Sequence, residues 1–175
     1  FIGSAWFYLK PLLLDHGFAA QQVALIAGVG GGIVAALASL LAVRVTRRIG
    51  VAKALPAVTL LSLLALLALA LAVLLRAPPA GFIAAALLVA LAMGAAASLA
   101  FGLMMYFARP GHSAADYGVQ ASLFAAGRML VPLAAGALLD QIGYGGMLLA
   151  LAVAMAGVTV LAFDSRALIA RQAAS

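Results

Sequence analysis

The sequence predicts an all-α integral membrane protein whose six transmembrane helices follow one another along 175 residues. Hydrophobic residues make up 68% of the chain and charged residues only 8%, which is too few to give a soluble domain its polar surface. Long apolar stretches fill the chain almost from end to end, and short polar gaps separate them. Residues 1–175 are therefore expected to form one transmembrane domain without a soluble part.

The six apolar stretches set the expected helices: residues 1–14, 20–43, 54–75, 81–107, 114–139 and 145–163. A helix needs about 20 residues to cross a hydrocarbon core of about 30 Å, and the last five stretches meet that length. The first covers only roughly 21 Å. It starts at Phe1 and lacks the basic region and cleavage site of a signal peptide. We therefore expect the chain to begin partway through a transmembrane helix.

The basic residues predict which way the helices insert. Seven of them follow the second and fourth stretches or lie in the C-terminal tail: Arg44, Arg47, Arg48, Lys53, Arg109, Arg166 and Arg171. The gaps on the other side contain only Arg76. Lys and Arg are retained on the cytoplasmic side of membrane proteins, so the C-terminus is expected in the cytoplasm. This placement accounts for the net charge of +6. We therefore expect the lipid bilayer, and not nucleic acid, as a partner.

The few reactive residues argue against an intramembrane enzyme. Such an enzyme needs a nucleophile, an acid/base group or a metal cluster within the bilayer. The sequence has no Cys, its acidic residues are four Asp, and His16 and His112 fall on opposite predicted sides. The hydrolase and metalloprotease motifs Gly-x-Ser-x-Gly and His-Glu-x-x-His are absent from the sequence. We expect no enzymatic activity, metal or cofactor.

Four of the predicted helices carry little besides Leu, Ala and Gly. The third and sixth are apolar on every face, which is typical of the lipid-exposed rim of a bundle. The second and fourth carry small residues at four-residue spacing, which favours close helix packing. These residues are Gly28, Gly32 and Ala36 in the second helix and Gly94, Ser98 and Gly102 in the fourth.

The first stretch carries polar residues with two interpretations each. Trp6, Tyr8 and Lys10 offer stacking surface and positive charge to an anionic or aromatic solute. Alternatively, Lys10 extends its stem to the outer interface, where Trp and Tyr also collect. Asp15 and His16 either cap the helix end or take part in proton coupling, since His titrates near physiological pH.

The fifth stretch is the most informative. Ser113 and Asp116 have the spacing of an N-terminal cap, so Asp116 either serves the helix start or carries a proton. Gln120 follows one turn later, and Arg128 lies about 18 Å from Asp116 along the axis. Arg128 is thus expected well inside the membrane, where it pairs with another helix or binds solute. A guanidinium group suits a carboxylate or phosphate, so an anionic solute is expected.

Two segments of the chain resemble the major facilitator superfamily of transporters. "GGGIVAALASLLAVRVTRRIGVAKAL" is similar to the family's eighth helix and the gating loop after it, represented here by Arg44, Arg47, Arg48 and Gly50. The usual Asp of that loop is missing. "ADYGVQASLFAAGRMLVPLAAGALLDQIGY" and "WFYLKPLLLDHGF" resemble the eleventh and seventh helices of a narrower branch. That branch includes muropeptide permeases, acetyl-CoA transporters and siderophore permeases of the rhizobactin/pyochelin type.

The resemblance implies a fold and a function. The chain would be the C-terminal six-helix half of a twelve-helix transporter, built from two inverted three-helix repeats. Its first and fourth helices would line the solute cavity, and its second and fifth would contact the missing N-terminal half. The expected function is proton-coupled transport of an organic anion such as a siderophore across the inner (plasma) membrane. A muropeptide permease and a six-helix subunit acting as a homodimer are the alternatives.

Overall fold

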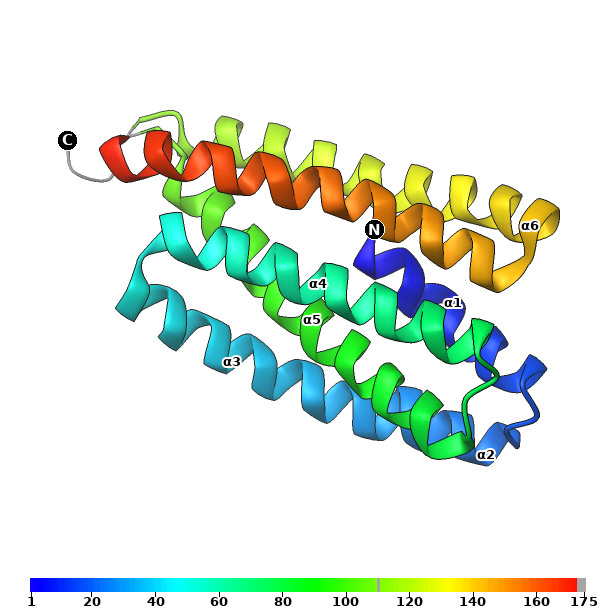
Figure 1. Ribbon diagram of the computed structural model, residues 1–175. Helices are drawn as coiled ribbons and strands as arrows, with labels where there is room; N and C mark the ends of the chain where they lie inside the picture. Colours follow the sequence, from blue (N-terminus) through cyan, green and yellow to red (C-terminus); the bar gives the residue numbers. More distant parts are fainter. Residues whose placement is uncertain (110, 173–175) are drawn as a thin grey trace.

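The computed structural model describes residues 1–109 and 111–172, with side chains up to Arg166, and it is helical throughout (Figure 1). The elements are the α-helices α1 (Ile2–Asp15), α2 (Ala20–Val23), α3 (Gly31–Ile49), α4 (Val51–Leu74), α5 (Pro79–Tyr106) and α6 (Ser113–Gln172), with the π-helical segment η1 (Ala24–Gly30) between α2 and α3. The long helices lie alongside one another in an elongated bundle.

The second predicted helix is longer than its apolar stretch. The elements α2, η1 and α3 form one helical run, Ala20–Ile49, that continues through the basic residues after position 43. Gly50 alone separates this run from α4. Its φ of 80° lies in the left-handed region that glycine adopts most readily, so the chain reverses there within one residue.

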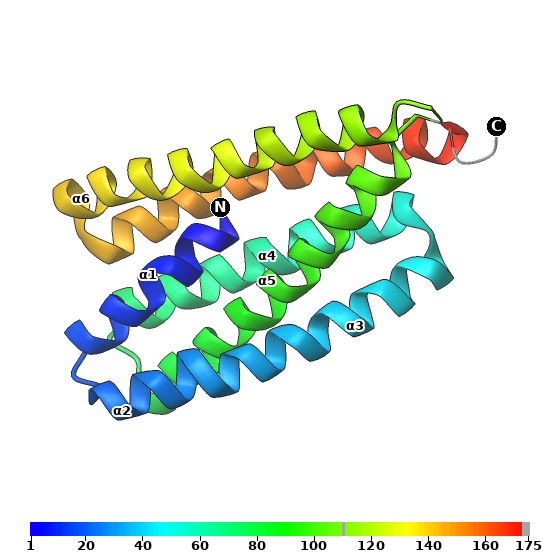
Figure 2. The same ribbon diagram turned by 180° about the vertical axis from the view of Figure 1, so that it is seen from behind.

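The helix α6 contains the last two predicted stretches. Gly143 interrupts it with φ 68° and ψ −179°. We call residues 113–142 the first arm of α6 and residues 144–172 the second arm. The second arm folds back along the bundle (Figures 1 and 2). A side chain at position 143 would be strained at this positive φ, so glycine permits the reversal.

Among the described residues, four helices are long and apolar enough to cross a membrane: Ala20–Ile49, Val51–Leu74, Pro79–Tyr106 and Ser113–Arg166, the last of which contains the reversal at Gly143. The helix α1 has 14 residues and spans only part of the bundle (Figure 1). The chain therefore has the properties of a multi-pass helical membrane protein. The number of six transmembrane helices stays a prediction.

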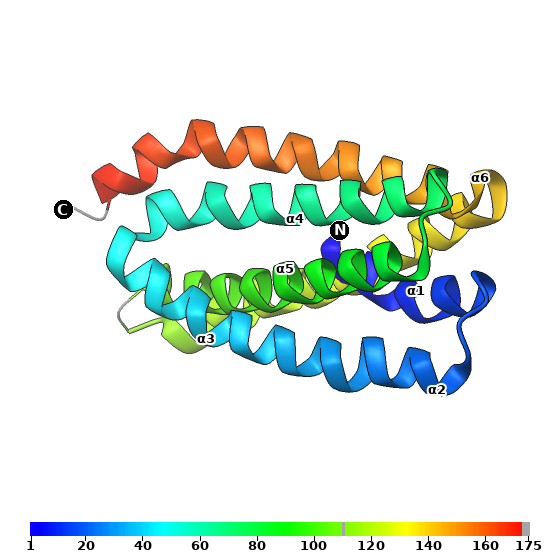
Figure 3. The same ribbon diagram turned by 60° about the horizontal axis from the view of Figure 1, so that its bottom comes forward.

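The two ends of the bundle differ in charge. The α3–α4 junction, the α5–α6 connection and the C-terminal part of α6 lie at one end, which we call the basic end (Figures 1 and 3). The α1–α2 connection, the α4–α5 connection and the turn between the two arms of α6 lie at the opposite end. Six exposed basic residues belong to the elements that meet at the basic end: Arg44, Arg47, Arg48, Lys53, Arg109 and Arg166. The side chain of Arg171 lies outside the described residues.

The helix α4 contributes one side of its apolar surface to the core. Leu66 and Leu69 of α4 are fully buried, together with Leu9 of α1 and Leu148 of the second arm. Two hydroxyl groups of α4 are also buried, and both donate hydrogen bonds to carbonyl oxygens of their own helix. These bonds offset the cost of burying a hydroxyl group. Only part of the α4 surface is left to face lipid.

The helices α3 and α5 approach most closely at Gly94. The hydroxyl group of Ser39 donates a hydrogen bond to the Gly94 carbonyl oxygen at 2.9 Å, and that of Ser98 donates to the Ser39 carbonyl oxygen at 3.2 Å. Only some of the small residues that were expected to allow close helix packing lie at this contact. Around Gly28, Gly32 and Gly102 a methyl group would meet nothing within 4 Å.

Candidate solute-binding site

Arg128 lies on the first arm of α6 beside two aromatic rings. Its guanidinium carbon is 5.9 Å from the centroid of the Phe124 ring, a cation–π distance. The Phe124 ring in turn meets Phe101 of α5 edge to face, with centroids 5.5 Å apart. Within residues 1–109 and 111–166, Arg128 forms no ion pair. Its exposed guanidinium group is therefore available to an anion, with apolar rings next to it.

The helix period places Arg128 on the inner side of the first arm. Gln120, Phe124, Arg128 and Pro132 recur every four residues and so follow one side of the helix. Gln120, Phe124 and Pro132 are half-buried. The opposite side carries large apolar residues that are more than three-fifths exposed, namely Val119, Leu123 and Leu133.

Tyr8 connects α1 to the first arm one turn beyond Arg128. Its hydroxyl group donates a hydrogen bond to the Pro132 carbonyl oxygen at 2.9 Å. Because proline has no N–H, the Arg128 carbonyl group also lacks its usual helical partner. Glycine at position 136 leaves room for the hydroxyl group, since a Cβ atom there would lie 2.5 Å from the Tyr8 oxygen. Two of the predicted contact residues, Tyr8 and Arg128, are thus brought to the same level of the bundle.

We expect Tyr8→Phe to lower the free energy of unfolding by about 1 kcal/mol, since it removes one interhelical hydrogen bond. Gly136→Ala should destabilise the wild-type protein by a similar amount because its methyl group meets the Tyr8 hydroxyl group. In the double variant that collision is absent. A double-mutant cycle of unfolding free energies in detergent should therefore be non-additive, and strict additivity would contradict this packing.

Trp6 and Lys10 do not join Tyr8 on one surface. The Trp6 ring lies over Gly31, where an added Cβ atom would be 3.1 Å from a ring carbon. Lys10 is exposed on the same side of α1 as Phe7 and Leu14. Residues two apart on a helix point about 200° from one another, so Lys10 points away from the Tyr8 contact. The single surface of Trp6, Tyr8 and Lys10 that was expected from the sequence therefore does not form.

Asp116 forms an ion pair at the basic end. Its two carboxylate oxygens accept hydrogen bonds from the Arg109 guanidinium group, both at 2.8 Å, and one also accepts from the Arg109 backbone N–H at 3.0 Å. These hydrogen bonds, followed by the charge of Asp116, raise the pKa of Arg109. The expected link between Ser113 and Asp116 does not form, because the turn containing Gly111 (φ 82°) brings Arg109 to the carboxylate instead.

Asp15 and His16 lie at the opposite end of the bundle. The Tyr144 hydroxyl group donates to the Asp15 carboxylate at 2.7 Å. The His16 Nδ1–H donates to the Leu12 carbonyl oxygen at 2.8 Å, and His16 is the C-cap residue of α1. The three candidates for proton coupling are therefore divided between the two ends. Sequence reasoning missed Tyr144, because nothing in an apolar stretch marks a partner 129 positions away.

The cytoplasmic gating loop expected from the resemblance is a tight turn. Arg44, Arg47 and Arg48 are exposed in the last turns of α3, and Gly50 ends that helix. The end of this helix carries positive charge without an acidic partner among the described residues.

An apolar cavity of about 310 Å³ lies between the two arms of α6 and is lined in part by Phe1, Leu130, Ala134 and Leu151. Its lining contains no polar side chain, so it offers an anion no partner. Within the described residues, no group of three or more His or Asp is placed to hold a metal ion. In comparisons with protein-family models, curated proteins and solved structures, nothing matches this chain.

Proposed function

We propose that the chain is one six-helix unit of a secondary transporter of the major facilitator type, which moves an organic anion by alternating access. The observation that carries this proposal is Arg128. Fifteen residues of helix separate it from the start of the first arm at Ser113 and fourteen from the end at position 142, which is roughly 22 and 21 Å. An Arg in the middle of a membrane costs at least about 2.5 kcal/mol and faces a cavity or a partner.

The surroundings of Arg128 indicate the class of solute. A guanidinium group binds a carboxylate through two parallel hydrogen bonds, and Phe124 and Phe101 offer an apolar surface beside it. This combination suits an organic acid with a planar or apolar body. A siderophore carboxylate is the leading candidate, and a muropeptide is the second.

The arrangement of the helices supports the same proposal. Figure 2 shows α1 and α5 lying between the α2–α3 run and the first arm of α6. In the proposed transporter the first and fourth helices line the cavity, and the second and fifth flank them. The helices have this arrangement if α1 and α5 are the first and fourth helices of the proposed transporter, and the α2–α3 run and the first arm of α6 are the second and fifth.

The flanking helices also carry the surface that a second unit would cover. Leu25, Ile33 and Leu37 of the Ala20–Ile49 run are more than half exposed, as are Leu123 and Leu133 of the first arm. Contiguous exposed apolar surface marks a protein or membrane contact. The small residues Gly28, Gly32 and Ala36 are exposed on the same run and would let another helix approach closely. The partner is an N-terminal six-helix half or a second copy of this chain.

We also propose that the basic end faces the cytoplasm, since Lys and Arg are retained on that side, and that the protein lies in the inner (plasma) membrane with its C-terminus inside. Proton coupling is assigned to Asp15, His16 or Asp116 together with groups of the other six-helix unit. Asp116 is the weakest of these candidates, because its carboxylate is held by Arg109.

The proposal is tested by transport. The protein, expressed from its complete coding sequence, is reconstituted into liposomes with an inward proton gradient. Uptake of a labelled ferric siderophore and of a labelled muropeptide is then measured. We expect saturable uptake of one of them that stops when a protonophore is added. Leakage that does not saturate, or no uptake of either compound, would count against a proton-coupled transporter of this class.

A further inference from the structure

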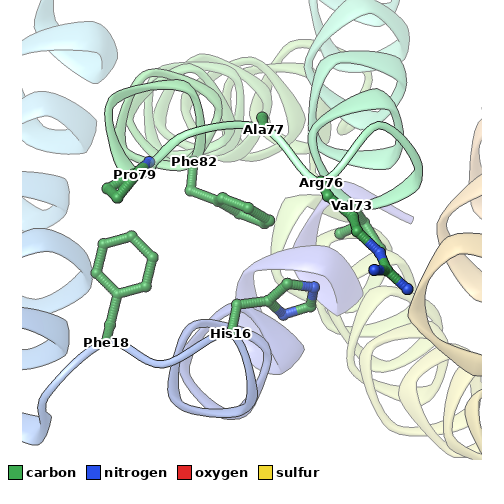
Figure 4. A pocket seen from close by; sticks show the side chains of 7 residues that line it. All are labelled: His16, Phe18, Val73, Arg76, Ala77, Pro79 and Phe82. Carbon is green, nitrogen blue, oxygen red and sulfur yellow. The ribbon is translucent and has the colours of Figure 1, made fainter.

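A second cavity lies at the end of the bundle opposite the basic end and has one apolar side and one polar side, the latter with Arg76. Its volume is about 310 Å³. Figure 4 shows Phe18, Phe82 and Pro79 on one side and the side chains of His16 and Arg76 on the other. The Phe18 and Phe82 rings meet edge to face, with centroids 6.1 Å apart. The residues come from the connection after α1, the connection after α4 and the start of α5.

Both polar groups of this cavity are free of acidic partners. The His16 Nδ1–H donates to the Leu12 carbonyl oxygen, and the His16 ring lies 4.8 Å from the Phe82 ring between centroids. Arg76 is exposed and makes no ion pair in the described part of the chain. Asp15, the acid nearest to His16 in sequence, accepts its hydrogen bond from Tyr144. The charge of Arg76 is therefore not neutralised by an acidic side chain among the described residues.

Arg76 occupies a backbone position that favours glycine. The helices α1 and α4 end in the same way: the residue after the C-cap has a positive φ, and the next N–H bonds to a carbonyl oxygen five residues back. In α1 this residue is Gly17 (φ 87°), whereas in α4 it is Arg76 (φ 49°). A side chain at this φ costs free energy. A costly residue in a cavity wall indicates a role for its side chain.

We propose that this cavity binds an oxyanion that carries an apolar, planar group. The oxyanion lies on the Arg76 guanidinium group, and the apolar body lies against Phe18 and Phe82. The site is separate from Arg128 and does not depend on transport. An organic carboxylate and the phosphate of a lipid headgroup share this chemistry, and the experiment distinguishes them.

The test uses 1-naphthoate as probe and the full chain in nanodiscs of a zwitterionic lipid. We expect saturable binding to the wild type and at least about a tenfold loss of affinity in Arg76→Gly, because a charged hydrogen-bonding partner is removed. The same variant relieves the positive φ, so its Tm should equal or exceed that of the wild type. Arg166→Gln, an exposed change at the basic end, should bind the probe like the wild type.

The variant Phe18→Ala provides a second measurement. It should weaken the binding of naphthoate more than the binding of acetate. Nanodiscs with added phosphatidylglycerol separate the two sources: competition with naphthoate assigns the site to a lipid headgroup, and undiminished binding assigns it to a soluble acid. Absence of binding to the wild type would overturn the proposal. Equal binding by Arg76→Gly, or a lower Tm of that variant, would do the same.

Discussion

Replacing Arg128 with alanine is expected to reduce solute uptake by about a hundredfold while the amount of protein in the membrane stays unchanged. The change removes two charge-assisted hydrogen bonds to the solute, a loss of about 3 kcal/mol. It should leave the fold intact, because Arg128 is exposed and makes no ion pair among residues 1–109 and 111–166. Initial rates in proteoliposomes measure the effect.

Two further variants make the Arg128 result specific. Arg128→Lys keeps the charge but loses the planar fork, and we expect partial uptake with a raised KM. Arg166→Ala, an exposed change at the basic end, removes a positive charge outside the candidate site and should transport like the wild type. Normal uptake by Arg128→Ala would remove Arg128 from the solute site.

Replacing Gly94 with alanine should be among the most destabilising single-methyl changes in the bundle. A Cβ atom at this position would overlap the Ala35 backbone, with the carbonyl oxygen nearest and both the carbonyl carbon and Cα at 2.8 Å. Backbone atoms cannot rotate away, so α3 and α5 must separate and the Ser39 and Ser98 hydrogen bonds weaken. We expect a loss of about 3 kcal/mol in unfolding free energy.

Gly102→Ala is the matched control for Gly94→Ala. It lies on the same helix, and a methyl group there would meet nothing within 4 Å. Unfolding in detergent, monitored by circular dichroism, should show a large fall in midpoint for Gly94→Ala and little change for Gly102→Ala. Similar midpoints for both variants would contradict the close approach of α3 and α5.

The lengths of the apolar stretches predicted most of the helical segments. The reversals at Gly50 and Gly143 use a positive φ, which glycine adopts most readily. The helix ends were less well predicted. Basic residues after position 43 marked the end of an apolar stretch but not the end of the helix, because Arg is a good helix former outside the hydrocarbon core.

The candidate site was predicted only in part. Helix rise placed Arg128 near the middle of its arm, but the contacts of Tyr8 with Pro132 and of Asp116 with Arg109 depend on how separate segments meet. Spacing likewise could not distinguish the face of Gly28 and Gly32, which is open, from that of Gly31, which lies under Trp6. Adjacent faces of a glycine-rich helix have the same period, and tertiary packing decides between them.

In the proposed transporter, the side of the first arm that carries Arg128 lines an aqueous solute pathway. The sequence contains no cysteine, so Arg128→Cys and Ala126→Cys each introduce a single thiol. The two positions point about 200° apart on the helix. We expect a hydrophilic, charged methanethiosulfonate reagent to modify Arg128→Cys in intact membranes and to leave Ala126→Cys largely unmodified. An unreactive Arg128→Cys variant, or equal rates at both positions, would contradict a solute pathway along this side of α6.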